Sequence, residues 1–162
     1  MDTKTEYSKK FLNALALETR KIIDEKIPIK KVFTDKQKYE NRLKAKKNAK
    51  VLDDEYPFVL IRPHIIKQSF KNGVAKKVQQ YLFRVGIINN TTPEEGYFEV
   101  AKYGDKIIRH YTNKPLATMS TDGYSYHVNL GEEIIAYLNE ELTADEYWTY
   151  DVIISFDIPA DK

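Results

Sequence analysis

The chain has 162 residues, of which 42% are hydrophobic and 31% are charged, and its formal net charge is +2. This length predicts a single domain over residues 1–162 that buries a core without disulfides or a structural metal. Near balance of charge excludes a globally basic surface, and the absence of cysteine excludes disulfides, thiolate metal sites and cysteine nucleophiles. We expect an intracellular setting, no secretory signal in MDTKTEYSKK and no membrane span.

Apolar residues at helical spacing predict a first helix over residues 5–26, which Pro28 ends. A short strand is expected over Ile29–Phe33. The next stretch is strongly biased, because positions 30–50 contain nine Lys or Arg against only Asp35 and Glu40.

This basic segment, residues 34–53, has two interpretations. Its composition is typical of a solvated helix face or a mobile loop. Clustered lysines also neutralise phosphates, which makes the following residues candidate contacts to DNA in a channel or to other phosphates: Lys44, Lys46, Lys47 and Lys50.

A β-hairpin is predicted from the apolar stretch YPFVLIRP, residues 56–63, to Ile87. Asn72-Gly73 is a strong hairpin signal, because both residues of a type I′ turn need positive φ. With that loop, position i pairs with 145 minus i. This register predicts one shared face for five apolar residues, Phe58, Leu60, Phe83, Val85 and Ile87, unless a bulge near Pro63 shifts it.

Beyond Pro63 the same hairpin becomes polar, so we expect it to leave the core as a protruding arm over residues 64–81. Proline lacks a ladder donor and is tolerated where pairing changes character. The candidate contacts to a neighbouring subunit or to a tube are His64, Phe70, Val74 and Tyr81.

A second helix is predicted to begin after Thr92, with Pro93 in the first position and Glu95 as capping-box partner. Apolar residues then recur at helical spacing from Tyr97 to Tyr111. Gly104 interrupts this stripe, which indicates a close contact with the sheet. The helix is expected to end at Asn113-Lys114-Pro115.

The remaining chain is predicted to contain a loop over residues 114–125 and then strands. Alternation is clearest in the last strand, where Tyr150, Val152, Ile154, Phe156 and Ile158 form the core face. The order of elements predicts an α+β domain: a mainly antiparallel sheet with two principal helices packed on it and a protruding β-hairpin.

Catalytic chemistry has no positive support in the sequence. His64, His110 and His127 are scattered, the glycines form no phosphate-binding loop, and no G-x-S-x-G elbow surrounds a serine. Paired acidic residues lie beside turns and helix starts, where carboxylates are expected anyway. We therefore predict no enzyme activity and no catalytic, metal or cofactor-binding residues.

The order of motifs resembles the tail terminator (tail completion) proteins of long-tailed bacteriophages. The resemblance lies in FLNALALETRKIID, DEYPFVLIRP, YLFRVGIINNT with PEEGYFEVAKYGDKIIRHY, and the closing YWTYDVIISFDIP, and it covers most of residues 6–159. It implies a structural virion protein that assembles as a ring, commonly hexameric, on the end of the tail tube. There it stops tube polymerisation and forms the head-tail joining surface.

The resemblance also implies partners: other copies of the chain, the tail tube protein, the head connector proteins and transiently passing DNA, with no membrane. The protein would be in the host cytoplasm during assembly and in the virion tail afterwards. Two alternatives stay open. One is a neck or head-completion ring protein, and the other is a nucleic-acid-binding module that uses residues 30–50.

Overall fold

A computed structural model describes residues 3–32, 56–114, 116–118 and 125–157 of the chain. The two helices are α1 (Thr3–Arg20) and α4 (Pro93–Asn113). The strands are β1 (Ile29–Lys31), β2 (Phe58–Lys71), β3 (Val74–Ile88), β4 (Leu116–Thr118), β5 (Ser125–His127), β6 (Ile135–Leu138) and β7 (Tyr147–Asp157).

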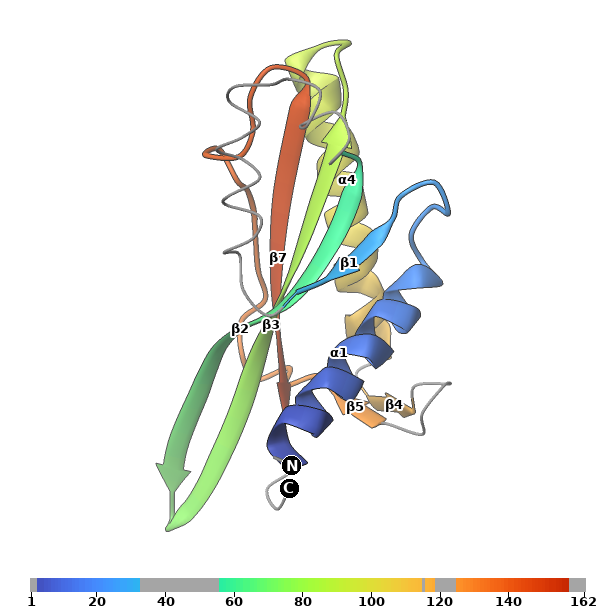
Figure 1. Ribbon diagram of the computed structural model, residues 1–162. Helices are drawn as coiled ribbons and strands as arrows, with labels where there is room; N and C mark the ends of the chain where they lie inside the picture. The colour runs from blue at the N-terminus through green and yellow to red at the C-terminus, as the bar shows by residue number, and fades with distance from the viewer. Residues whose placement is uncertain (1–2, 33–55, 115, 119–124, 158–162) are drawn as a thin grey trace.

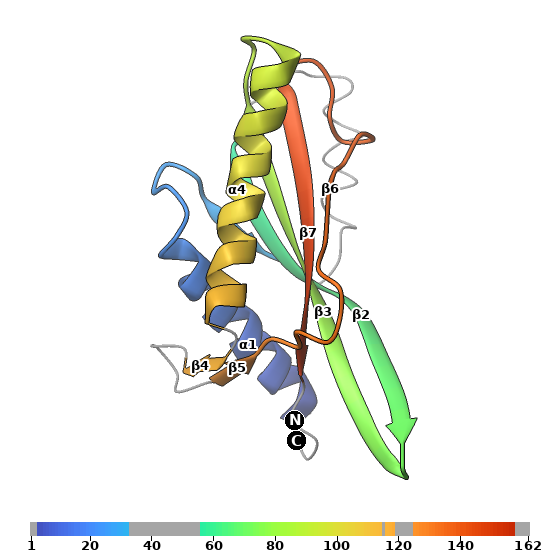
Figure 2. The same ribbon diagram turned by 180° about the vertical axis from the view of Figure 1, so that it is seen from behind.

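Five of these strands form one sheet in the order β1-β2-β3-β7-β6, and β4 pairs with β5 separately. Every pairing in the large sheet is antiparallel except that of β1 with β2. Figures 1 and 2 show α1 and α4 on the same side of this sheet. The predicted α+β fold, with two helices on a mainly antiparallel sheet and a hairpin, is confirmed.

The core lies between the helices and the sheet. Helix α1 contributes Phe11, Leu12 and Leu15, and α4 contributes Val100, Ile107 and Tyr111. The sheet side of this core is made by alternate residues of three strands: Val59 and Ile61 of β2, Tyr81, Phe83, Val85 and Ile87 of β3, and Val152, Ile154 and Phe156 of β7. The predicted core face of the last strand is thus confirmed from Tyr150 to Phe156, and Ile158 lies outside the described residues.

Buried polar contacts join the two helices. The Thr19 and Tyr111 hydroxyls lie 3.0 Å apart, and His110 Nε2 lies 2.9 Å from Glu18 Oε1. Burial alone would raise the pKa of the Glu18 carboxyl, but hydrogen bonds from Lys21 and His110 outweigh it and lower that pKa. His110 therefore links α4 to α1.

Helix α4 begins and ends as predicted. The Thr92 side chain accepts a hydrogen bond from the Glu95 backbone nitrogen at 3.1 Å, and Pro93 occupies the first turn. A Cβ placed on Gly104 would lie 2.6 Å from the Tyr150 ring, so this glycine does permit close approach of α4 to β7.

Helix α1 ends earlier than predicted, at Arg20 rather than at residue 26. The Arg20 guanidinium donates to the carbonyl oxygens of Ile27 at 2.7 Å and Ile23 at 3.1 Å, and also to that of Asp24. A side chain thus satisfies carbonyls that helical N–H groups would otherwise bond, and the chain turns toward β1. Ile23 and Ile27 are still buried, although they lie beyond the end of the helix.

Two short strands escaped the sequence-based expectation. The loop predicted over residues 114–125 contains β4. Strand β6 lies in a stretch for which the sequence predicted no particular strand. In the described part of the chain, neither helix combines the length and apolarity needed to cross a membrane.

Candidate functional site

The β2-β3 hairpin runs well beyond the rest of the sheet. Strand β1 pairs with β2 only over residues 59–61, and β7 pairs with β3 only from Val78 onwards. Among the described residues, 64–77, which we call the arm, therefore form a ribbon of two strands only. Figures 1 and 2 show the arm projecting away from the helices, with its turn at one extreme of the molecule.

The turn of the arm has the predicted chemistry. Asn72 and Gly73 have φ values of 55° and 76°, so both adopt the left-handed region that a type I′ turn needs. The register next to the turn is also confirmed, since Lys71 pairs with Val74 and Ile66 pairs with Gln79.

A β-bulge separates the arm from the core. Between Pro63, which pairs with Tyr81, and Ile66, which pairs with Gln79, two residues of β2 oppose one of β3. The predicted register is therefore wrong by one residue on the core side of Pro63. Leu60 pairs with Arg84 rather than Val85, Phe58 with Gly86 rather than Ile87, and Arg62 with Leu82 rather than Phe83.

The shift changes which side chains face the helices. Val59 and Ile61 lie in the main core with Phe83, whereas Phe58 and Leu60 lie on the opposite face of the sheet. There they pack with Tyr56 and Tyr147. A one-residue shift moves every side chain of a strand to the other face, so the expected common face of Phe58 and Leu60 with Phe83 is corrected.

The four candidate arm contacts lie in different environments. Phe70 and Val74 are exposed, at 73% and 66%, and His64 is half-buried beside the bulge. Tyr81 is only 4% exposed, with its ring centroid 5.3 Å from that of Phe11 and 5.7 Å from that of Phe156. Tyr81 is therefore a core residue, and the free arm is shorter than the predicted residues 64–81.

Two apolar residues of the arm were missed by sequence reasoning. Ile65 and Ile66 are more than half exposed, next to the bulge. Their exposure could have been predicted from the run His64-Ile65-Ile66, because two consecutive isoleucines in a polar ribbon cannot both face one side of a strand. Together with Phe70 and Val74 they give the arm a set of exposed apolar side chains, which the described part of the chain does not cover.

The base of the arm is fastened to the connection between β5 and β6. Lys67 Nζ lies 3.1 Å from Glu132 Oε2. A cleft of about 560 Å³ lies beside this ion pair, lined by Lys67, Gln68, Ser69, Lys76, Val78, Asn129, Gly131 and Glu132. An exposed pair of this kind contributes little stability.

The other predicted site residues give no further constellation. Lys44, Lys46, Lys47 and Lys50 lie outside the described residues. His127 Nδ1 lies 3.3 Å from Asp157 Oδ2, far along the chain from the pair of His110 with Glu18. Over the described ranges, no three His, Asp or Glu residues are grouped so as to hold a metal ion.

Comparison with known proteins adds no assignment. No protein-family model matches the chain, and a search of curated proteins finds no significant relative.

Proposed function

We propose that the protein is a structural subunit of a long-tailed bacteriophage that assembles as a ring, commonly a hexamer, on the end of the tail tube. In this role it acts as a tail terminator: it stops polymerisation of the tube and offers the surface to which the head connector docks. The sequence motifs that resemble tail terminators support this proposal, and so does the α+β fold, which is what that resemblance implies.

The main structural support for the proposal is the arm. Its exposed apolar side chains lie on a ribbon to which the described residues add no third strand. Water-facing apolar groups and open strand edges mark surfaces for other chains. A monomer has no use for such an arm. A subunit that must bind a neighbouring subunit or a tube has one.

A test follows from the geometry of the arm. Lys67 and Val78 pair directly, and so do Lys71 and Val74 around the turn. Deleting residues 68–71 and 74–77 while keeping Asn72-Gly73 therefore rebuilds the same turn on a shorter ribbon. We call this chain the short-arm variant.

The experiment adds purified protein to polymerising tail-tube subunits of the same phage and measures tube lengths by electron microscopy. The wild-type protein is expected to shorten the tubes and to appear as a ring at one end, whereas the short-arm variant is expected to do neither. Unchanged tube lengths with the wild-type protein would contradict the proposal.

The same preparation separates the alternatives. A neck or head-completion ring would bind the connector and leave tube growth unchanged. A nucleic-acid-binding module would show affinity for DNA that falls as salt is raised, with no ring in micrographs.

A further inference from the structure

The two ends of the molecule carry opposite charge. The arm contains four lysines and no carboxylate: Lys67, Lys71, Lys76 and Lys77. Residues 88–99 and 139–148, which we call the acidic end, contain seven carboxylates and no Lys or Arg: Glu94, Glu95, Glu99, Glu140, Glu141, Asp145 and Glu146. Figure 1 shows the β3-α4 and β6-β7 connections at the extreme of the molecule opposite the arm turn.

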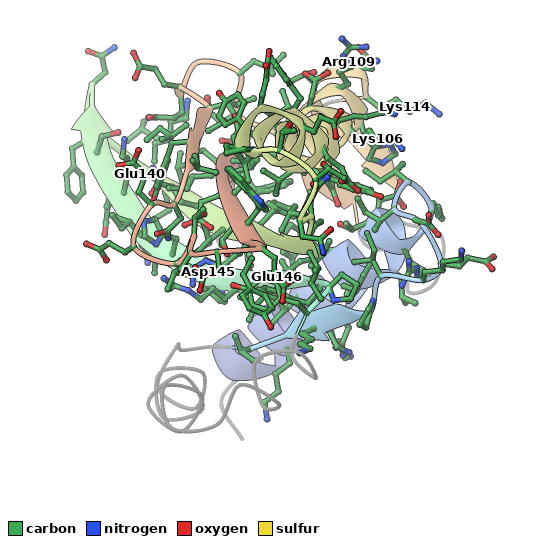
Figure 3. All side chains as sticks on the ribbon, turned by 90° about the horizontal axis from the view of Figure 1, so that it is seen from above. Lys106, Arg109, Lys114, Glu140, Asp145 and Glu146 are labelled. Atoms are coloured by element: carbon green, nitrogen blue, oxygen red, sulfur yellow. The ribbon has the colours of Figure 1, made fainter. Side chains whose placement is uncertain are left out.

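Figure 3 looks down on the acidic end. Glu140, Asp145 and Glu146 lie along the β6-β7 connection, away from Lys106 and Arg109 of α4 and from Lys114, which follows it. Among the described residues, none of the seven carboxylates forms an ion pair within the chain. The part of the chain that the structure describes therefore offers this concentration of negative charge no basic partner.

The acidic end also has exposed apolar side chains and a small cleft. Phe98 is 61% exposed, and Ile88 and Tyr97 are each about two-fifths exposed. The cleft, about 200 Å³, lies between the two connections and is lined by Asn89, Asn90, Thr91, Thr92, Pro93, Asp145, Glu146 and Trp148. It is smaller than the pockets that hold drug-sized ligands, so it suits a protruding side chain better.

We propose that the arm of one copy docks on the acidic end of a second copy, with Phe70 and Val74 against the apolar residues and the lysines beside the carboxylates. The arm turn and the acidic end lie at opposite extremes of the molecule, so an arm cannot reach its own acidic end. Contact between two different surfaces is heterologous, and it closes a ring or runs on as a filament.

A second copy fits the arm better when it presents its acidic end than when it presents its own arm. Arm-to-arm pairing would bring eight lysines together, and like charges placed side by side disfavour association. The docking inference rests on the proposed function, because it specifies which surfaces join the subunits of the ring.

The test uses three matched charge-reversal variants of the full chain. The arm variant is Lys76→Glu/Lys77→Glu, and the end variant is Glu94→Lys/Glu95→Lys. The control is Lys102→Glu/Lys106→Glu, which changes two exposed lysines of α4 that belong to neither surface. Circular dichroism and thermal melting of each variant verify that it is folded.

Sedimentation velocity at low and high salt then measures self-association. We expect the wild-type protein and the control to associate, and each of the other two variants to associate at least about tenfold more weakly, a loss of about 1.4 kcal/mol. A mixture of the arm variant and the end variant is expected to associate again, because one of them supplies an intact arm and the other an intact acidic end. Raising the salt should weaken every association that forms.

Several results would overturn the inference: a wild-type protein that stays monomeric at high concentration, an arm variant that associates as the wild type does, or a control that alone loses association. Loss of binding to duplex DNA in the arm variant, with no self-association of the wild type, would identify a nucleic-acid surface instead. Rings that persist in the arm variant would overturn the docking mode and leave the proposed function standing. Arm-dependent association without any effect on tube growth would overturn the proposed function and leave the docking mode standing.

Discussion

Arg84 and Asp151 form a bidentate ion pair between β3 and β7, on the sheet face opposite the helices. Arg84 Nε lies 2.8 Å from Asp151 Oδ1, and Arg84 Nη2 lies 3.0 Å from Asp151 Oδ2. Both side chains are buried, and Asp151 Oδ2 also accepts a hydrogen bond from Asn139 at 2.9 Å. The charges therefore have the partners that buried charges require.

Removing one partner of this pair should be costly. We expect Asp151→Asn to lower the free energy of unfolding by about 3–5 kcal/mol, because Arg84 would keep a buried charge without its counter-ion. Urea denaturation measures the loss. The double variant Arg84→Met/Asp151→Leu should lose less than Asp151→Asn alone, and a larger loss in the double variant would contradict this account.

Gly104 should resist substitution although it lies in the middle of a helix. Alanine would gain about 1 kcal/mol of helix propensity, but its Cβ would meet the Tyr150 ring at 2.6 Å. We therefore expect Gly104→Ala to lower the melting temperature of the wild-type protein. In a Tyr150→Ala background the same change should be neutral or stabilising, and equal effects in both backgrounds would refute the contact.

The Glu18 carboxyl should make stability depend on pH in the acid range. Its pKa in the folded protein lies below the ordinary value of 4.5, so folding favours the ionised form. This contribution is present above about pH 4.5 and is lost as the pH falls through the lowered pKa. The difference in unfolding free energy between wild type and Glu18→Gln should shrink over that interval. A difference that stays constant from neutral to acid pH would contradict the assignment.

The short-arm variant should keep its fold. The residues it lacks contribute nothing to the main core, and the deleted stretches include the exposed Phe70 and Val74. We expect its free energy of unfolding to stay within about 1 kcal/mol of the wild-type value, as is usual for surface changes. Loss of cooperative unfolding would show that the arm stabilises the monomer, which this account excludes.

Features governed by neighbouring residues could be predicted from the sequence. The Asn72-Gly73 turn, the Thr92 cap and the alternation of Val152, Ile154 and Phe156 all depend on local backbone preference or on the spacing of side chains along one element. The structure confirms each of them. These features were sufficient to predict the fold class.

The features that the sequence could not determine depend on contacts between distant elements. Alternation along the hairpin is compatible with two registers, which differ in the residues of β2 that face the helices. In the structure these are Val59 and Ile61. The bulge lies beside Pro63, and the shift that it makes in the register places Phe58 and Leu60 on the opposite face.

The sequence by itself thus determined the turn, the helix boundaries of α4 and the presence of an arm. Only the tertiary structure decided where the arm begins, that Tyr81 is not part of it, and that Arg84 meets Asp151. The physical reason is that periodicity records which residues are apolar, whereas register and pairing are set by close packing among α1, β3 and β7.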